Sequence, residues 1–591
     1  MTEGGEILEI ELKPLEPSTG RPDRGRWVIV GVLTVLVFQF TVIGLLQAWS
    51  DSFTFDEPFY AASGSTTIRE QDMRINIEHP PLPKVLAAIP AELFGDVDIP
   101  METGAWEAGD TWNLSLQMYQ ANLDDIQTTT FLYRIVPTLI AAGVGILLYL
   151  LARELFGRGA GLFAAALWLT APIAVGYGHL NGLDVPAAFT VVLSMWLVAR
   201  YIDRPTLVRL ALAGLSVGVA LLTRAAVGLV VAAAVFGAVL LADLLRRNWW
   251  APLRAIAMLV VGWLVVWIGY AVIDPAGLWG EPGAWLPATE SLPARLALLV
   301  PWPRRYDEGI LFLSDFHAST ESSGYLFGSA FNGAPNWFWF GSFVFKMTIG
   351  SMIAIAGGVI AWILLRDRKA AWAALVLLPM LAGLVVMMAF AERPFGARYL
   401  VPIVVILFVV ASPLARLATR RWMIASLGLI VILQIGHLWA SHPSTFAWSN
   451  PLLRESWQLA ADSNVDWGQD FYRLQEWAVD QDEAVWISYF GFGPSFELSE
   501  IPNAVSAHPY NVWGPMQLPP STITTYAISA SNLNAFAGES VGLLRSYCPV
   551  EIIGRTILVY RFEQSPGILW SEVDGVPYGV CEDSDVSVEG S

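Results

Sequence analysis

Long apolar stretches recur along the first three quarters of the 591-residue chain, and short polar or charged segments separate them. A helix that crosses a bilayer needs about 20 consecutive apolar residues. Stretches of about this length lie at 27–49, 131–151, 160–177, 185–201, 206–222, 226–245, 255–273, 337–364, 370–391, 400–415 and 422–440. The pattern predicts an all-α polytopic membrane bundle of about eleven helices.

Lys and Arg predict how this bundle is oriented. If the amino terminus is cytoplasmic, 18 of the 34 basic residues fall in cytoplasmic segments, and the short loops of the opposite side are nearly bare of them. This asymmetry is what the positive-inside rule requires. We therefore expect residues 1–26 to form a cytoplasmic tail and residues 27–440 to form the membrane domain. An odd number of spans places residues 441–591 outside the cytoplasm.

Residues 441–591 differ in pattern from the rest of the chain. Short apolar runs alternate with Gly, Pro and Asn, which predicts a soluble mixed α/β domain. This region carries 19 acidic and 5 basic residues, a net charge of −14. It also holds both cysteines, Cys548 and Cys581, in a compartment that permits disulfides. We expect a bridge between them, with two unpaired thiols as the alternative.

Two long segments interrupt the apolar pattern on the expected outer side, at residues 50–130 and 274–336. Structureless loops of this length are uncommon, so we expect both to form helices at the membrane surface. Composition agrees with a membrane protein, because 55% of residues are hydrophobic, 15% are charged and the mean hydropathy is +0.52. The net charge of −18 argues against nucleic acid as a partner, and the cysteine spacing does not suggest zinc.

The strongest candidate for chemistry is the pair Asp56 and Glu57, which follows the first span among Phe and Tyr residues. Carboxylates in such surroundings are poorly solvated, and a raised pKa would suit a general base. The alternative is structural, because Asp ahead of Glu-Pro is also good chemistry for the start of a helix.

A second cluster is Glu78-His79-Pro80-Pro81, which is either a rigid corner or part of a site. Arg134, Asp184 and Arg224 fall at the outer ends of predicted spans. On position alone these three are more typical of anchors or interhelical ion pairs than of a catalytic site.

Lys346 stands apart, because it lies nine residues after Trp337, about 13 Å along a continuous helix. A lysine at that depth needs an anionic partner, either a carboxylate of the bundle or a ligand phosphate. Arg393 and Arg398 lie in a short loop before the tenth span. The three cations predict an anion clamp, with interfacial anchors as the alternative for the two arginines.

Outward-facing carboxylates and cations on a membrane bundle suit sugar transfer from a polyprenyl-phosphate donor. The phosphate leaving group is already a stable anion, so it needs no protonation by a second carboxylic acid, unlike glycoside hydrolysis. One base would take the proton of an acceptor hydroxyl, and a cationic clamp would stabilise charge on the departing phosphate.

Motifs in chain order carry a family resemblance. They are Asp56-Glu57, Glu78-His79-Pro80-Pro81-Leu82, Tyr133-Arg134, Gly182-Leu183-Asp184, Tyr325-Leu326-Phe327-Gly328, Lys346, Arg398-Tyr399-Leu400-Val401-Pro402 and Asp462-Ser463-Asn464-Val465-Asp466-Trp467-Gly468-Gln469-Asp470. With them the chain resembles the GT-C membrane glycosyltransferases of the protein O-mannosyltransferase class, in a bacterial and archaeal branch. This class is similar in turn to the lipid A aminoarabinose transferases.

The resemblance implies roles for residues of this chain. Asp56 would be the catalytic base and Glu57 its neighbour in an acidic pair. Glu78 and His79 would border the cavity, where relatives often have Lys in place of His79. The lipid phosphate would be held by Arg134, Lys346 and Arg398, with Asp184, Arg393 and Tyr399 in support. Relatives usually have Thr-Pro after the lysine, whereas here Met347 and Thr348 follow it.

The last motif has two interpretations, and both stay open. Asp462, Asp466 and Trp467 would either face the cavity on the acceptor side or form a structural turn that docks the outer domain. Some relatives place a divalent metal near the carboxylates that correspond to Asp56, Glu57, Glu78 and Asp184, and others use none, so metal dependence also stays open.

The expected function is therefore that of an inverting, multi-pass glycosyltransferase of the plasma membrane. Its partners would be a polyprenyl-phosphate sugar as donor and a hydroxyl of protein Ser or Thr, an envelope glycan or a lipid as acceptor. A transporter or lipid flippase is the alternative from another class. It predicts inverted repeats or broken Gly/Pro helices in matched halves, and the sequence shows neither. A non-catalytic assembly subunit is a third possibility, which intact Asp56 and Lys346 argue against.

Overall fold

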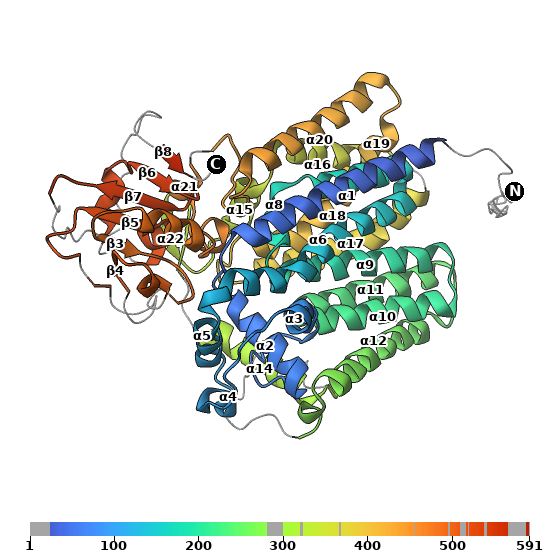
Figure 1. Ribbon diagram of the computed structural model, residues 1–591. Helices are drawn as coiled ribbons and strands as arrows, with labels where there is room; N and C mark the ends of the chain where they lie inside the picture. Colours follow the sequence, from blue (N-terminus) through green and yellow to red (C-terminus); the bar gives the residue numbers. More distant parts are fainter. Residues whose placement is uncertain are drawn as a thin grey trace, which may run out of the picture.

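The structure, a computed structural model, describes residues 24–280, 300–319, 323–365, 368–453, 455–493, 497–508, 516–517, 519–536, 541–564 and 587–589. A bundle of long helices makes up most of the molecule, and a smaller sheet domain lies beside one end of the bundle (Figure 1). This confirms the predicted fold class. Most of the expected cytoplasmic tail, residues 1–23, lies outside the described residues.

Every predicted span coincides with helix. The bundle consists of α1 (Arg24–Ser50), α6 (Ile126–Phe156), α7 (Arg158–Leu169), α8 (Pro172–Gly178), α9 (Asp184–Asp203), α10 (Leu207–Thr223), α11 (Ala225–Leu245), α12 (Ala251–Ile273), α15 (Phe338–Lys346), α16 (Ile349–Leu364), α17 (Arg368–Ala389), α18 (Val401–Ala411), α19 (Pro413–Leu417) and α20 (Arg421–Ser441). Within the described ranges, eight helical segments are long and apolar enough to cross a membrane, or ten if two bent pairs each form one span. The predicted number of eleven, which also includes the 17-residue α10, stays a prediction, as does the orientation.

The two bent pairs differ from the continuous helices that the apolar pattern predicts. α7 and α8 meet at 60°, just before Pro172, a residue that cannot continue the hydrogen bonding of a helix. α15 and α16 meet at 116°, so the predicted span 337–364 is wrong as a single straight helix. The break follows Lys346, and the Thr348 side chain starts α16 by accepting a hydrogen bond from Ser351 N at 3.2 Å.

The two long interrupting segments are built largely of short elements. Residues 50–130 contain α2 (Glu57–Glu70), α3 (Leu82–Phe94), α4 (Gly104–Ala108), α5 (Thr111–Ala121) and the 3₁₀ turn η1 (Leu123–Asp125). Residues 274–336 contain η2 (Pro275–Gly277), α14 (Arg304–Ser319) and a hairpin of β1 (Ser323–Leu326) and β2 (Ser329–Asn332). α2 and α3 pack closely, since a Cβ at Gly64 would lie 2.3 Å from the carbonyl oxygen of Lys84.

The C-terminal domain is the expected mixed α/β unit. Its six-stranded sheet has the order β4 (Ala504–Ser506), β3 (Val485–Ser488), β5 (Thr525–Ser529), β7 (Ile557–Arg561), β6 (Glu551–Ile553) and β8 (Ser587–Glu589). β3 is parallel to both neighbours, while β7 is antiparallel to β5 and β6. Both faces are buried, and α22 (Phe471–Val479) covers one of them.

Shorter elements complete this domain. They are α21 (Ser456–Leu459), the 3₁₀ turns η4 (Asp462–Asn464), η5 (Leu498–Glu500) and η7 (Gly542–Ser546), and the π-helical turn η6 (Asn532–Phe536). Cys548 is disulfide-bonded, and the second cysteine of the chain, Cys581, lies outside the described residues.

The domain and the bundle are joined next to the first span. Ser52 N donates to Gln469 O at 3.0 Å, and Phe55 N donates to Trp467 O at 3.0 Å. The Ser52 hydroxyl donates to Gly468 O and accepts from Phe471 N, at 2.7 and 3.0 Å. The predicted acidic pair therefore directly follows a segment that is hydrogen-bonded to the C-terminal domain. We refer to residues 462–473 as the docking segment.

Candidate active site

Asp56 and Glu57 are adjacent in sequence but have different partners. Asp56 occupies the N-cap position of α2, and Pro58 follows in the first turn. Its side chain makes no capping hydrogen bond. Asp56 thus occupies the position that the structural alternative gives it but makes no capping hydrogen bond, and Glu57 is the acidic first-turn residue of that alternative.

Glu57 is held by Arg134 of α6. Arg134 Nε lies 2.9 Å from Glu57 Oε1, and Nη2 lies 2.5 Å from Oε2. Glu57 also accepts hydrogen bonds from Thr54 N and Asn181 N, both at 2.7 Å. These contacts lower the pKa of Glu57, although burial acts to raise it. Glu57 is thus an ionised and fully engaged carboxylate.

Arg134 has no donor left for a ligand. Besides Glu57, it donates from Nη1 to Ala48 O and Asp51 O and from Nη2 to Ser52 O, at 3.2, 2.5 and 2.7 Å. These bonds use all five N–H groups of the guanidinium, and the side chain is fully buried. The expected contact of Arg134 with a lipid phosphate therefore has no support in this geometry. The interhelical ion pair, left open by its position, matches what is observed.

Asp56 instead meets Arg398, whose Nη1 donates to Asp56 Oδ2 at 2.6 Å. Arg398 lies on the 3₁₀ turn η3 (Ala397–Leu400), ahead of α18. Its guanidinium carbon lies 4.2 Å from the ring centroid of Trp467, and its Nε donates to Phe395 O at 3.2 Å. The Asp56 side chain is 23% exposed, whereas that of Glu57 is 1% exposed. Asp56 is thus the accessible member of the acidic pair.

A second arginine, Arg224, also lies against the Tyr399 ring. Arg224 occupies the one-residue break between α10 and α11, and its Nη1 donates to Asp184 Oδ1 at the start of α9. Its guanidinium carbon lies 4.2 Å from the Tyr399 ring centroid, and that of Arg398 lies 5.6 Å from it. In the part of the chain that the structure describes, Nη2 of Arg398 and both Nε and Nη2 of Arg224 have no hydrogen-bond partner.

Glu78 interacts electrostatically with Asp56. It lies between α2 and α3 and accepts a hydrogen bond from Asn76 Nδ2. Burial and the negative charge of Asp56 raise the pKa of Glu78, while the positive charge of Lys84 opposes this shift. The His79 ring lies beside that of Tyr60, with centroids 6.1 Å apart.

The resemblance implies that relatives often have a lysine where this chain has His79. Lys84 does not take over the role of that lysine. Its Nζ donates to Asn76 O, Asn76 Oδ1 and His79 O at 2.6, 3.2 and 2.8 Å. Burial lowers the pKa of Lys84 to about 7. Lys84 therefore ties the Glu78 loop to α3 with all three of its donors.

The motif of residues 462–470 serves both of its open interpretations. Asp462 adopts a left-handed conformation, with φ of 54°, and interacts electrostatically with Arg398 and Asp56. Burial raises the pKa of Asp462 to about 6. Trp467 also contacts the site through Arg398. Asp462 and Trp467 thus face the site.

Asp466 and Asp470 instead hold the docking segment against the rest of its own domain. Asp466 Oδ2 accepts a hydrogen bond from Ser531 N at 2.8 Å, and Asp470 Oδ2 accepts one from the Thr556 hydroxyl at 2.5 Å. Burial raises the pKa of Asp466 to about 7 and that of Asp470 to about 6. Both carboxyl groups bind the sheet domain and lie outside the contacts around Arg398.

Lys346 and Arg393 are not in contact with Asp56. Lys346 Nζ donates to Phe446 O and Trp448 O, both at 2.7 Å, and among the described residues no carboxylate lies within ion-pair distance of it. It lies 5.7 Å from the Phe446 ring, which in turn stacks on Trp467. The carboxylate partner expected for Lys346 is thus replaced by backbone carbonyls. Arg393 binds Phe316 O and stacks on the Phe316 ring at 3.9 Å.

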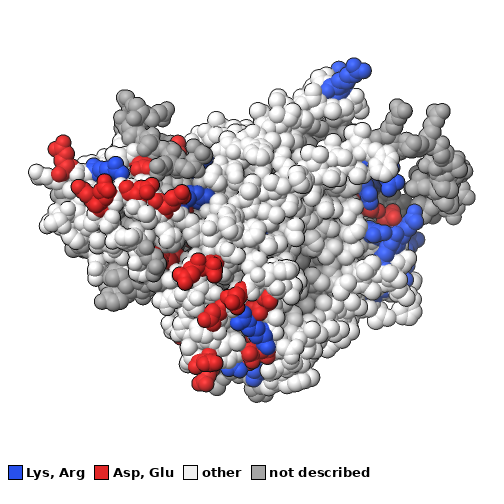
Figure 2. Space-filling view, in the orientation of Figure 1, with Lys and Arg blue, Asp and Glu red and all other residues white. Residues whose placement is uncertain are grey.

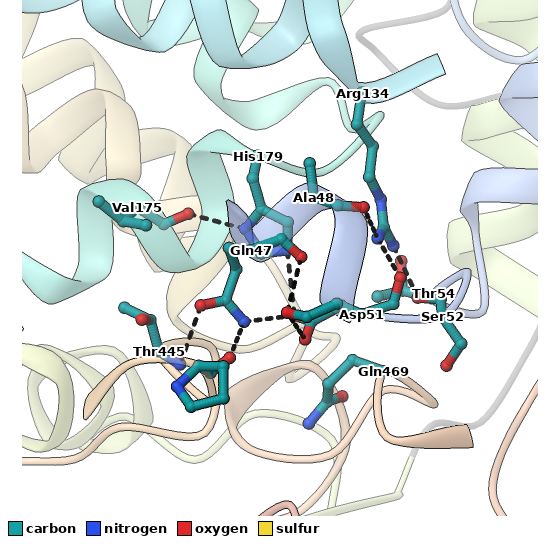
Figure 3. Close-up of polar contacts among 12 residues, drawn as sticks. Gln47, Ala48, Asp51, Ser52, Thr54, Arg134, Val175, His179, Thr445 and Gln469 are labelled. Atoms are coloured by element: carbon teal, nitrogen blue, oxygen red, sulfur yellow. Dashed lines mark hydrogen bonds and ion pairs between the residues drawn. The ribbon is translucent and has the colours of Figure 1, made fainter. Parts of the chain in front are cut away.

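The site contains a buried charge centre that the sequence pattern did not reveal. Asp51 Oδ2 accepts from Gln47 Nε2 at 2.7 Å and lies 3.2 Å from His179 Nε2 (Figure 3). Asp51 Oδ1 accepts from Arg473 Nη2 of α22 at 2.9 Å. Burial acts to raise the pKa of Asp51, but Arg473, His179 and Arg134 together lower it to about 2. A carboxylate two residues beyond the predicted span 27–49 was the available signal.

The carboxylates do not fit a metal site as they stand. Among the described residues, no group of three or more His, Cys, Asp and Glu side chains is arranged to hold a metal ion. Asp56 and Asp184 each face an arginine instead. We therefore derive no catalytic step through a metal ion.

Comparisons with known proteins agree with this picture. Residues 126–272 match the family model described as dolichyl-phosphate-mannose-protein mannosyltransferase, which covers about a quarter of the chain and includes Arg134, Asp184 and Arg224. No curated protein sequence matches the chain.

Solved structures match over most of the length. One is the archaeal oligosaccharyltransferase AglB from Archaeoglobus fulgidus, in complex with an inhibitory peptide and a dolichol-phosphate. It has a TM-score of 0.50 and 12% identity, over 93% of this chain and 77% of that one. Another is ArnT from Cupriavidus metallidurans bound to undecaprenyl phosphate, with a TM-score of 0.44 and 15% identity over 91% and 98% of the two chains. The GT-C fold expected from the resemblance is therefore confirmed.

Proposed function

We propose that this protein transfers a monosaccharide, with inversion at the anomeric carbon, from a polyprenyl-phosphate donor to a hydroxyl acceptor. The observation that carries the proposal is the state of Asp56. Within the described residues its carboxylate has one hydrogen-bond partner, Arg398, and it is partly exposed. Arg224, which has unused donors among these residues, lies against the same Tyr399 ring that Arg398 approaches. The family description and the fold shared with AglB support the same chemistry.

Asp56 acts as the general base. The acceptor hydroxyl donates a hydrogen bond to the free oxygen of Asp56 and loses its proton to that oxygen as it attacks the anomeric carbon. The bond between this carbon and the phosphate oxygen breaks, and the polyprenyl phosphate leaves with the bonding electrons. A single displacement of this kind inverts the anomeric configuration. Asp56 then releases the proton to water.

Arg398 and Arg224 stabilise the departing phosphate. Arg398 and Arg224 are 9% and 8% exposed, and in the described part of the chain each has donors that no protein group accepts, so a ligand or water can accept from them. Arginine suits phosphate because its planar fork binds two oxygens at once. The clamp proposed here thus retains Arg398, adds Arg224, and omits Arg134 and Lys346, whose donors already bind protein groups.

Other side chains border the reacting groups. Glu78, Asp462 and Asp184 would place carboxylates around the donor sugar and the acceptor, and His79 and Tyr399 would complete the wall. Because Asp462 and Trp467 belong to the docking segment, the acceptor side of the site would lie between the bundle and the C-terminal domain. The acceptor class is a hydroxyl of protein Ser or Thr, an envelope glycan or a lipid.

We propose that the site faces away from the cytoplasm, in the plasma membrane. Lys and Arg gather at the end of the bundle where α1 begins, while Asp and Glu are prominent on the sheet domain and the outer helices (Figure 2). The positive-inside rule places the first end in the cytoplasm. Asp56 lies at the other end of α1.

A transfer assay tests the proposal. Wild-type protein and Asp56→Asn are reconstituted in nanodiscs with a panel of radiolabelled polyprenyl-phosphate monosaccharides and a detergent extract of native membranes as acceptor. Wild type is expected to label the acceptor, and Asp56→Asn is expected to be slower by about 10²- to 10⁴-fold. Asp203→Asn, a change of a 56% exposed carboxylate at the far end of α9, is the matched control. Equal transfer by wild type and Asp56→Asn would remove the assigned base.

A further inference from the structure

Arg473 of the C-terminal domain forms a buried ion pair with the membrane domain. It donates from Nη2 to Asp51 Oδ1 at 2.9 Å, and its Nη1 binds Asp470, three residues earlier in the chain. Asp51 and Asp470 are at most 1% exposed, and the Arg473 side chain is 12% exposed. An ion pair at this depth is costly unless its geometry is well satisfied, and it is strongly destabilised when one partner is removed.

The second oxygen of Asp51 fixes the orientation of the carboxylate. Gln47 Nε2 lies 2.7 Å from Oδ2, and His179 Nε2 lies 3.2 Å from it (Figure 3). The other ring nitrogen of His179, Nδ1, lies 2.8 Å from Val175 O. Asp51 is therefore held by side chains of α1, by His179 directly after α8, and by α22.

Asp51 connects in turn to the residues around Asp56. Its carbonyl oxygen accepts from Arg134 Nη1 at 2.5 Å, and the same guanidinium holds Glu57. The segment between Asp51 and Asp56 also pairs with residues 467–471 through four hydrogen bonds. The chain that leads into Asp56 is thus fixed by Arg134 on one side and by the docking segment on the other.

The docking segment also meets the partner of Asp56. Trp467 stacks on Arg398 at 4.2 Å, and Asp462 interacts with the same guanidinium. Movement of the docking segment relative to Asp51 would therefore displace both members of the Asp56–Arg398 pair. A misplacement of about 1 Å can slow catalysis about 10²-fold, even when the moved group is remote from the chemistry.

We infer that Arg473 is a positioning residue, which sets the C-terminal domain against Asp51 and thereby places Asp56 and Arg398 for sugar transfer. This inference rests on the proposed function. The C-terminal domain then takes part in turnover, because the ion pair between Arg473 and Asp51 makes the position of the catalytic groups depend on both domains. Arg473 itself would contact neither the donor phosphate nor the acceptor.

Steady-state kinetics of the full-length protein test this inference. Arg473→Gln is expected to lower kcat by about 10- to 100-fold while the donor KM stays within about 2-fold. Arg473→Lys keeps the positive charge next to Asp51 and is expected to restore most of the rate. The matched control is Arg561→Gln, a half-exposed arginine of the same domain. The donor is whichever polyprenyl-phosphate monosaccharide the wild type transfers.

The outcomes separate this inference from the function on which it rests. If Arg473→Gln keeps wild-type kcat, or if Arg473→Lys is as slow as Arg473→Gln, the positioning role is wrong. If Arg473→Gln fails to fold, the double variant Asp51→Asn, Arg473→Gln removes both members of the ion pair with Asp51, leaves Asp470 in place, and carries the same expectation of lower kcat at unchanged KM. Asp56→Asn is assayed in parallel, because full activity in that variant would instead overturn the proposed function.

Discussion

Two neighbouring ion pairs, Glu57–Arg134 and Asp56–Arg398, have opposite surroundings. In the first, both side chains are at most 1% exposed, and every N–H of the arginine binds a protein oxygen. In the second, both side chains are partly exposed, and donors of the arginine have no protein partner among the described residues. A complete set of partners fixes geometry, whereas an incomplete set can receive a substrate.

The difference shows how one dipeptide can serve two purposes. Glu57 uses its contacts with Arg134 to anchor the start of α2, and this leaves Asp56 free to face Arg398. The contrast gives separate expectations for stability and for turnover. Changes at the first pair should act on folding, and changes around the second pair should act on transfer.

The largest expected effect is at the complete pair. Glu57→Gln leaves the Arg134 charge buried without its partner, so we expect a loss of about 3 to 5 kcal/mol in the free energy of unfolding. Thermal unfolding in detergent measures this loss of stability. A melting temperature equal to that of the wild type would show that Glu57 does not anchor this region.

The next effect belongs to the incomplete pair and its neighbour. Arg224→Met removes a proposed phosphate contact, and we expect a loss of about 10²- to 10³-fold in kcat, with a smaller change in melting temperature than Glu57→Gln causes. The measurement is single-turnover transfer. The control is Arg209→Met, which removes an arginine from the opposite end of α10. Unchanged turnover would remove Arg224 from the clamp.

The docking segment should show a pH effect on stability. Burial raises the pKa of Asp466 to about 7, above its ordinary value of 3.8. The stabilisation that the neutral carboxyl contributes is therefore present at low pH and is lost as pH rises through 7. In Asp466→Asn the side-chain oxygen can still accept a hydrogen bond from Ser531 N, but the side chain can no longer ionise.

We expect Asp466→Asn to melt higher than the wild type by a smaller margin at pH 5.5 than at pH 8, because the stabilisation by the neutral carboxyl is lost progressively between its ordinary pKa and about 7. At pH 8 the variant should melt a few degrees higher. Comparing the two proteins at each pH removes the contribution of other titrating groups. A difference that does not change between pH 5.5 and pH 8 would contradict the raised pKa.

The smallest effect is expected at Lys346. Its ammonium binds two backbone carbonyls, so Lys346→Met removes both these hydrogen bonds and a buried charge. The two consequences oppose each other, and we expect a change of about 1 kcal/mol in stability. Donor affinity, measured by binding of a labelled polyprenyl phosphate, should be unchanged. A large loss of affinity would return Lys346 to the phosphate clamp.

The helices were predictable because each depends on a local run of apolar residues. The break after Lys346 was not, because 337–364 is mostly apolar and has no Pro, and the carbonyls that Lys346 contacts at the break are about 100 residues away. The same holds for the site. Asp56 stands out in the sequence, but its contact with Arg398 joins residues separated by 342 positions.

The arginines show the limit most clearly. Arg134, Arg224 and Arg398 all lie at the expected outer ends of spans, so position alone does not separate them. Their partners do, because Arg134 is saturated by Glu57 and three carbonyls, while the other two retain donors without a partner among the described residues. Asp51 was missed for the same reason, since its ligands come from α1, His179 and α22.

The central claim is that Asp56 accepts the proton of the acceptor hydroxyl. Single-turnover transfer at saturating donor, with donor affinity measured on the same preparations, tests it most directly. Asp56→Asn is expected to bind polyprenyl-phosphate sugar nearly as well as the wild type and to transfer it at least about 10²-fold more slowly. Transfer at the wild-type rate by the folded variant would contradict the assignment of Asp56 as the base.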